Sequence, residues 1–361
     1  MTARLGTPTF WERSRCMRQM VLTGIEGMEI REVQAPQIVR DTDVLIRVGA
    51  VGVCGSDIHY YTKGRIGDQV VQYPFSVGHE GAGEVAEVGR AVKRVRPGDR
   101  VAIDPAISCG ECDQCRSGRR HTCRKLLFLG CPGQVEGCLG EYLVMPEQSC
   151  YPVDARTVSL EAAAFSEPLA IGVWATELAG SLRDAAVGIL GFGPIGASVL
   201  LASLGSRPRR VYVSDRIDAR LEIARTTGAS WVGNPDRQDI VRSIVAEEPR
   251  RLDVVFECCG KQEALDQATE LLKPAGKLMF VGIPEADRVC FSPDRLRRGE
   301  LCIQNVRRQN ECVDKALGLL ASGAVELSLF VTHRYPFGRV KEAFDVVKDY
   351  RDGVMKAMVM F

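Results

Sequence analysis

Short apolar runs separated by turn residues characterise the chain from about residue 17 to residue 160. Residues 44–48 read Val-Leu-Ile-Arg-Val, residues 84–88 read Glu-Val-Ala-Glu-Val, and residues 100–103 read Arg-Val-Ala-Ile. The segment Arg96-Pro97-Gly98-Asp99 supplies a turn between the last two runs. Short runs rich in Val and Ile and bounded by Gly, Pro and Asp are typical of strands. The pattern predicts a compact, mostly antiparallel β domain whose loops carry the segments around Cys54 and His79.

The pattern changes after Ser159, where apolar strands alternate with helix-length segments. Strands are expected at residues 186–190, 210–213, 252–257, 277–282 and 301–306, with helices at residues 197–204 and in a segment ended by residues 273–276. Such alternation indicates βαβ units and a parallel sheet. An amphipathic run at residues 340–347 and a β-like run at residues 355–361 are expected to return to the first domain.

The chain has 361 residues, which exceeds the roughly 250–300 residues at which a single core stops growing. Two domains are therefore expected. The fold prediction is an α/β protein in which a doubly wound parallel sheet is inserted into a mostly antiparallel β domain. The predicted boundaries are residues 1–16 for a mobile N-terminal extension, 17–167 and 306–361 for the β domain, and 168–305 for the inserted domain.

Composition excludes several classes of partner. Lys plus Arg (47) nearly equals Asp plus Glu (46) and no basic stripe is visible, so nucleic acid is not expected as a partner. No apolar run approaches the roughly 18 residues that a membrane helix needs. Fourteen cysteines in a chain of this length, without a recognisable signal peptide, are interpreted as thiols and metal ligands. We expect a cytoplasmic protein with a small-molecule substrate.

The segment Gly52 to Tyr61, which contains Cys54, is followed about twenty residues later by Gly78-His79-Glu80. A thiolate, an imidazole and a carboxylate are ligands that zinc accepts, and three protein ligands leave a fourth position open for catalysis. On these residues alone, a buried cysteine and a core histidine explain the pattern equally well.

Cys109, Cys112, Cys115 and Cys123 form a second set with the spacing C-x2-C-x2-C-x7-C. Four thiolates at these spacings can close around one ion and leave no open position, which is typical of structural zinc. An iron–sulfur cluster is an alternative, although the spacing lacks the ferredoxin pattern. His121 lies among the cysteines and is interpreted as a bystander.

Gly191-Phe192-Gly193-Pro194-Ile195-Gly196 directly follows an expected strand and opens an expected helix, and Asp215 ends the next strand. This context predicts a Rossmann dinucleotide site. Gly191 allows the tight turn, Gly193 the approach of the pyrophosphate and Gly196 close helix packing. An acidic residue at position 215 favours NAD, whereas the adjacent Arg216 could accommodate the extra phosphate of NADP.

Taken together, these features resemble the zinc-dependent medium-chain dehydrogenases, and within them the sorbitol (polyol) dehydrogenases. The resemblance covers nearly the whole chain from Met17 and implies a GroES-like catalytic domain. It is carried by Gly52 to Tyr61, Lys63 to Gly67, Gly78 to Glu80, Pro97 to Ala102, Glu167 to Ala170, Gly193 to Gly196 and Val331 to Arg334.

The resemblance also implies roles for individual residues. Cys54, His79 and Glu80 would bind a catalytic zinc, with Glu167 as a further ligand or as the residue that holds the water on the zinc. Ser56 and His59 would pass protons toward solvent, although a local hydrogen-bonding turn explains them equally well. Substrate contacts would be Tyr60, Glu167 and Arg308. Nucleotide contacts would be Gly191, Gly193, Ile195, Gly196, Asp215, Arg220, Val281, Gly282, Ile283, Val306 and Arg308.

Two positions depart from the polyol enzymes: Arg307 replaces an apolar residue, and Gln309 replaces a tyrosine that often touches substrate.

The expected reaction is oxidation of a secondary hydroxyl of a sorbitol- or xylitol-like polyol by NAD. One catalytic and one structural zinc are expected per chain. The alternatives are a butanediol or threonine dehydrogenase and, more remotely, a non-catalytic zinc-stabilised nucleotide-binding protein. We also expect a homo-oligomer, a dimer or a tetramer, paired through residues 301–306.

Overall fold

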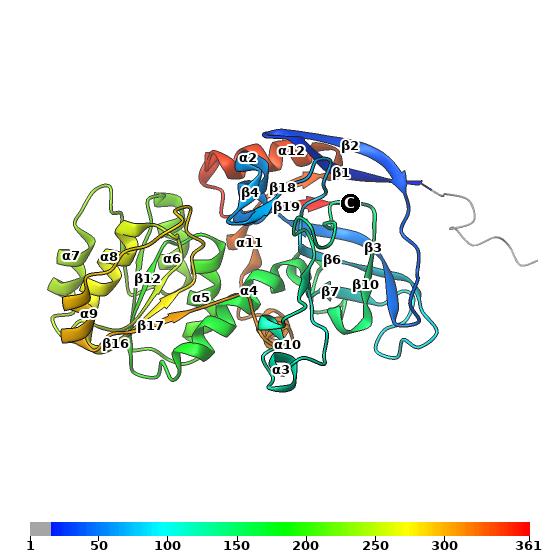
Figure 1. The fold of residues 1–361 in the computed structure, drawn as a ribbon. Helices are drawn as coiled ribbons and strands as arrows, with labels where there is room; N and C mark the ends of the chain where they lie inside the picture. The colour runs from blue at the N-terminus through cyan, green and yellow to red at the C-terminus, as the bar shows by residue number, and fades with distance from the viewer. Residues whose placement is uncertain (1–15) are drawn as a thin grey trace, which may run out of the picture.

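The computed structural model describes residues 16–361 and contains two large sheets of different kinds, besides three two-stranded ones, with helices between and around them (Figure 1). The predicted extension lies outside the described residues except for Cys16, which begins the first strand. A seven-stranded sheet has the order β11-β7-β6-β3-β19-β18, with β10 also paired to β3. A six-stranded sheet has the order β14-β13-β12-β15-β16-β17. The α/β prediction is confirmed.

The seven-stranded sheet is antiparallel except for the pair β18 and β19. Its strands come from both ends of the described chain, because β19 lies between β3 and β18. The strands outside the parallel sheet are β1 Cys16–Gly24, β2 Gly27–Gln34, β3 Asp43–Gly52, β4 Arg65–Ile66, β5 Gln69–Val70, β6 Glu80–Val88, β7 Arg100–Ile103, β8 Ala106–Ile107, β9 Leu127–Phe128, β10 Tyr142–Pro146, β11 Cys150–Val153, β18 Val331–Pro336 and β19 Lys356–Met360.

All pairs in the six-stranded sheet are parallel. Its strands are β12 Ala186–Leu190, β13 Arg210–Ser214, β14 Trp231–Gly233, β15 Leu252–Glu257, β16 Leu272–Phe280 and β17 Cys302–Asn305. The strand expected at residues 277–282 begins earlier, at Leu272, because the preceding helix ends at Leu271. β17 forms one edge of this sheet, where a further strand could pair with it. The predicted pairing with a second copy of the chain stays a prediction.

The helices are α2 Gly55–Lys63, α3 Asp113–Arg116, α4 Leu160–Ala179, α5 Pro194–Leu204, α6 Asp218–Thr227, α7 Ile240–Glu247, α8 Gln262–Leu271, α9 Pro293–Gly299, α10 Val313–Ala321, α11 Leu327–Phe330 and α12 Val340–Lys348. Short 3-10 helices are η1 Arg120–Thr122, η2 Glu147–Ser149, η3 Phe337–Arg339 and η4 Arg351–Gly353. Among the helices of residues 16–361, none is long and apolar enough to cross a membrane.

Helix α4 connects the two sheets. It packs on β3, β6 and β7 of one sheet domain and on α5 of the other, and it is buried on most sides, as its apolar sequence requires. The Ser159 hydroxyl caps its first turn by accepting a hydrogen bond from the Ala162 N–H at 3.1 Å. The predicted domain boundary at 167/168 falls within this helix, and the boundaries stay a prediction.

Candidate active site and metal centres

Cys54, His79 and Glu80 converge at one end of the antiparallel sheet. Their ligand atoms lie within 4.8 Å of one another. β3 and β6 pair so that Gly52 faces Glu80, which places the residues after β3 beside the start of β6. Sequence spacing alone left two explanations for these residues, and the convergence favours a metal site. Thiolate, imidazole and carboxylate form a donor set suited to zinc.

Asp57 supports this set and was not among the predicted site residues. It is fully buried. Its carboxylate faces His79 Nδ1 at 3.3 Å and accepts hydrogen bonds from the Cys54 and Gly78 N–H groups, both at 3.2 Å. A carboxylate on one ring nitrogen fixes the histidine and leaves Nε2 as the free nitrogen. Its position three residues after Cys54 was the available sequence signal.

Lys356 is a second residue that the sequence reasoning missed. Its Nζ contacts both Glu80 carboxylate oxygens at 2.7 Å and donates to the Val53 carbonyl at 3.2 Å. Both side chains of the ion pair are only 1% exposed. The lysine lies in β19 within the otherwise apolar run Val354 to Met360. A charged residue in a strand of this kind is a sign of a buried partner.

Glu167 lies in α4 and is buried, but it does not belong to the close set of Cys54, His79 and Glu80. Burial raises the pKa of Glu167 to about 7; the charge of His79 opposes this effect and that of Glu80 adds to it. The charge of Lys356 also opposes the rise. The residue is therefore close enough to sense the charges of the set, and its role as a ligand stays a prediction.

Ser56, His59 and Tyr60 lie on helix α2, which begins directly after Cys54. Cys54 and His79 lie in loops, as predicted, but the residues after Cys54 form a helix, because the Asp57 carboxylate accepts a hydrogen bond from the Cys54 N–H and begins it. Burial lowers the pKa of His59, with the charge of Glu285 opposing that effect. Since Glu285 pairs with Lys63 at 3.0 Å, this face of α2 meets the parallel-sheet domain. The proton-transfer roles stay a prediction.

Tyr60 is buried, and its hydroxyl donates to Gln69 Oε1 at 2.9 Å and lies 3.9 Å from Cys131 Sγ. The Arg308 guanidinium carbon stacks over the Phe128 ring at 3.6 Å from its centroid. The Phe128 ring in turn contacts the His79 ring, with the centroids 5.4 Å apart. Tyr60 and Arg308 therefore border the same region as the candidate metal ligands.

Gln309 is held by two hydrogen bonds. Its amide donates to Asp104 Oδ2 at 2.9 Å and accepts from the Cys312 N–H at 2.8 Å. The residue is only 6% exposed. Gln309 therefore connects its own loop to the residue that follows β7.

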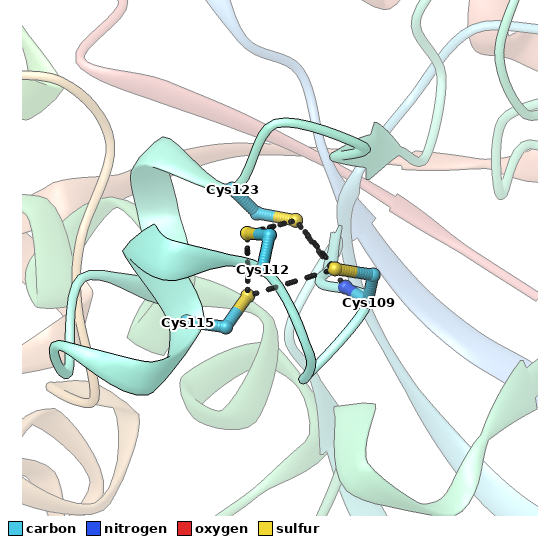
Figure 2. A group of neighbouring side chains, drawn as sticks. All are labelled: Cys109, Cys112, Cys115 and Cys123. Atoms are coloured by element: carbon cyan, nitrogen blue, oxygen red, sulfur yellow. Dashed lines mark hydrogen bonds between the residues drawn. The ribbon is translucent and has the colours of Figure 1, made fainter.

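Figure 2 shows the four sulfurs of Cys109, Cys112, Cys115 and Cys123 pointing at a common centre. Neighbouring sulfurs lie 3.4 to 3.9 Å apart. A tetrahedral ion with metal–sulfur bonds of about 2.3 Å separates its sulfurs by about 3.8 Å, so a single ion fits, whereas a four-iron cluster would hold each cysteine on a separate iron. Backbone N–H groups lower the pKa of Cys112 to about 6.

His121 is excluded from that cysteine set, as predicted. It is buried, and its ring packs edge-on against Trp174 of α4 with the centroids 5.1 Å apart. The loop after β17 also contacts this lobe, because the Asn310 amide donates to the Gly118 carbonyl at 2.8 Å. The cysteine lobe therefore supports the loop that carries Arg308.

The predicted nucleotide contacts gather at the carboxyl edge of the parallel sheet. They follow β12, β13, β16 and β17, where a doubly wound sheet binds its ligand. Gly191 has φ 90° and forms the turn. A Cβ on Gly196 would lie 2.0 Å from the Gly191 carbonyl oxygen, so glycine is required there. Val281 is buried and Ile283 is 49% exposed, while Ile195, Gly282 and Val306 are partly exposed.

Asp215 connects the glycine turn to the next loop, because its carboxylate accepts hydrogen bonds from the Phe192 N–H at 2.6 Å and the Ile217 N–H at 2.8 Å. Arg216 is engaged elsewhere, in an ion pair with Asp236 at 2.9 Å. Arg220 donates to the Val354 carbonyl, and its Nη1 lies 3.5 Å from the position of a Cβ on Gly193. The Arg220 side chain is therefore beside the glycine turn.

Comparison with known families defines the class of the protein. The Alcohol dehydrogenase GroES-like domain matches residues 40–155, and the Zinc-binding dehydrogenase family matches residues 194–322. These two matches correspond to the antiparallel sheet with the candidate metal centres and to the parallel sheet with the glycine turn. The fold and the site are those of a zinc-binding dehydrogenase.

Individual relatives indicate the branch of the zinc-binding dehydrogenases to which the chain is most similar. Sorbitol dehydrogenase of Bacillus subtilis (strain 168) is 33% identical over 344 residues, covering 95% of this chain and 97% of the relative. L-idonate 5-dehydrogenase of Vitis vinifera is 34% identical, covering 90% and 89%. A zinc-binding dehydrogenase structure from Sinorhizobium meliloti 1021, bound to NADP, has a TM-score of 0.87 at 29% identity, covering 96% and 100%. The chain belongs to the polyol branch of the zinc-dependent medium-chain dehydrogenases.

Proposed function

We propose that the protein oxidises a secondary hydroxyl of a sugar alcohol to a ketose, with NAD as the hydride acceptor. The observation that carries the proposal is the convergence of Cys54, His79 and Glu80 within 4.8 Å. The sorbitol dehydrogenase of Bacillus subtilis, which aligns over nearly the whole chain, supports the substrate class. When bound, zinc supplies a Lewis acid that lowers the pKa of a coordinated hydroxyl, and the nicotinamide takes the hydride.

Metal binding, proton transfer and substrate binding are assigned to different residues of the site. Cys54, His79 and Glu80 hold the metal, and Asp57 fixes the ring of His79. Glu167, whose pKa of about 7 permits both protonation states near neutral pH, holds or moves a proton at its carboxylate. Tyr60 and Arg308 bind and orient the substrate hydroxyls.

A proton leaves through the face of α2. Ser56 and His59 lie one helical turn apart on this helix, and His59 senses the charge of Glu285 in the parallel-sheet domain. The lowered pKa of His59 keeps the imidazole neutral at pH 7, so that it can accept a proton and release it to solvent.

NAD is favoured over NADP by the surroundings of Asp215. A carboxylate at this position receives ribose hydroxyls and repels a 2′-phosphate. Arg216, which could offset that repulsion, is already paired with Asp236. Because the similar structure from Sinorhizobium meliloti has NADP bound, activity should be measured with both NAD and NADP.

The set of Cys109, Cys112, Cys115 and Cys123 is proposed to hold a second, structural zinc.

The proposal is tested by initial rates of NADH formation with sorbitol, xylitol, galactitol, ribitol, 2,3-butanediol and threonine, with NAD and NADP in parallel. We expect polyol turnover with NAD, lost in Cys54→Ser and kept in Cys290→Ser, which alters an exposed cysteine of the parallel-sheet domain. Oxidation of butanediol or threonine without any polyol would move the protein to a neighbouring branch. Zinc and nucleotide binding without turnover of any substrate would support the non-catalytic alternative.

A further inference from the structure

Arg307 and Arg308 form no ion pair with any residue of the described chain, 16–361, although the overall charge of the protein is nearly balanced. Arg307 is exposed, whereas Arg308 is partly buried against Phe128. Burial, followed by the charge of Arg307, lowers the pKa of Arg308 to about 10. Withdrawing a guanidinium from water without an ion-pair partner is unfavourable, and the charge of Glu167 offsets the cost only in part, so a further partner is expected from outside the chain.

The two arginines lie near Tyr60, one of the predicted substrate contacts. The charges of both act on Cys131, whose sulfur lies 3.9 Å from the Tyr60 hydroxyl. Arg307 also acts on the buried His121 of the cysteine lobe. None of these neighbours belongs to the glycine turn, so the pyrophosphate of the cofactor is not the expected partner.

The loop directly after Arg308 is held by hydrogen bonds. Arg308 has φ 53°, a left-handed conformation that is unfavourable for a residue with a side chain. Gln309 is held by Asp104 and by the Cys312 N–H, and the Asn310 amide is held by the Gly118 carbonyl. A guanidinium group is suited to a carboxylate or a phosphate, which it can bind with two parallel hydrogen bonds.

We propose that the substrate is a polyol with a terminal anionic group, a carboxylate or a phosphate monoester, and that Arg307 and Arg308 bind this group. This inference rests on the proposed function, which supplies the oxidised hydroxyl. The two sources of negative charge share the same chemistry, and the experiment separates them.

The test compares kcat/KM for sorbitol and xylitol with that for L-idonate, which carries a carboxylate, and galactitol 1-phosphate, which carries a phosphate. We expect one anionic substrate to be preferred by at least about tenfold, with a KM that rises with salt. Arg307→Gln should lower the ratio of anionic to neutral kcat/KM by about tenfold, through KM, and Arg307→Lys should restore part of it. Arg242→Gln removes an exposed arginine of α7 that forms no ion pair within residues 16–361, and it should leave the ratio unchanged.

Titration calorimetry of L-idonate and galactitol 1-phosphate against the zinc-loaded protein adds a readout that does not need turnover. Equal or better use of neutral polyols, with a ratio unaffected by Arg307→Gln, would overturn the anionic inference and leave the polyol proposal intact. Absence of turnover with every polyol, charged or neutral, would overturn both. The proposed function and the anionic inference would both be supported if one anion were the preferred substrate and if Arg307→Gln abolished its binding in calorimetry.

Discussion

Replacing Lys356 by methionine, which has a similar length and no charge, should destabilise the protein strongly. Lys356 and Glu80 are each 1% exposed, and the lysine contacts both carboxylate oxygens at 2.7 Å. In Lys356→Met the carboxylate loses its charged partner and has no access to water. Removing one partner of a buried ion pair costs about 3–5 kcal/mol in free energy of unfolding.

Two companion variants separate this effect from simple loss of packing. In Lys356→Met combined with Glu80→Gln, no unpaired charge remains, so most of the lost stability should return. Lys348→Met removes a more exposed pair, with Glu26 at 3.0 Å, and should leave the free energy of unfolding almost unchanged because water already solvates both charges.

Urea unfolding of the chelator-treated proteins, followed by circular dichroism, measures these differences. Chelation is needed because a metal bound to Glu80 would itself offset the unpaired charge. If Lys356→Met lay within about 1 kcal/mol of the wild type, the reasoning about the buried pair would be refuted. A double variant no more stable than the single one would refute it equally.

Three further outcomes are expected. Asp57→Asn should weaken zinc binding about 10- to 100-fold in a competition assay with a chromogenic chelator, because His79 and the Cys54 N–H lose a charged partner; unchanged affinity would remove Asp57 from the site. Burial raises the pKa of Asp104 to about 6, above its unfolded value of about 4, so the folded state binds the proton more tightly and stability is lost as pH rises through 6. Relative to Asp104→Asn, the wild type should lose about 2 kcal/mol between pH 4 and pH 7 in denaturant titrations, and a constant difference would contradict this. Cys115→Ser should reduce the zinc content by one ion per chain in mass spectrometry, whereas Cys302→Ser, at an exposed position, should not.

The sequence predicted the fold well because its signals were periodic and long. Alternating strands and helices after Ser159 correspond to the parallel sheet, and the glycine motif lies directly after β12, as expected. Local hydrogen bonds were harder to predict. Cys54 lies in a loop, as expected, but the helix α2 that directly follows it was not expected; it begins where the Asp57 carboxylate accepts a hydrogen bond from the Cys54 N–H.

The ligand set could be predicted because its members cluster in two short segments, but its supporting residues could not. Lys356 lies 276 positions from Glu80, so only the pairing of β19 with β3 brings them together. Gln309 was interpreted as part of the substrate rim, and nothing in its sequence neighbourhood indicates that Asp104 holds it inward. Long-range contacts of this kind depend on the completed fold.

The central position of β19 in the antiparallel sheet also has consequences for synthesis on the ribosome. The six parallel strands come from one continuous stretch, so that sheet can form while later residues are still being added. The other sheet cannot be completed until residues 356–360 emerge, because β19 lies between β3 and β18 and brings the lysine that neutralises Glu80. During translation the Glu80 carboxylate therefore has no ion-pair partner until Lys356, which lies 276 residues later in the chain, has been added. Nascent chains stalled before Lys356 should consequently contain a folded nucleotide-binding half and an incomplete catalytic half.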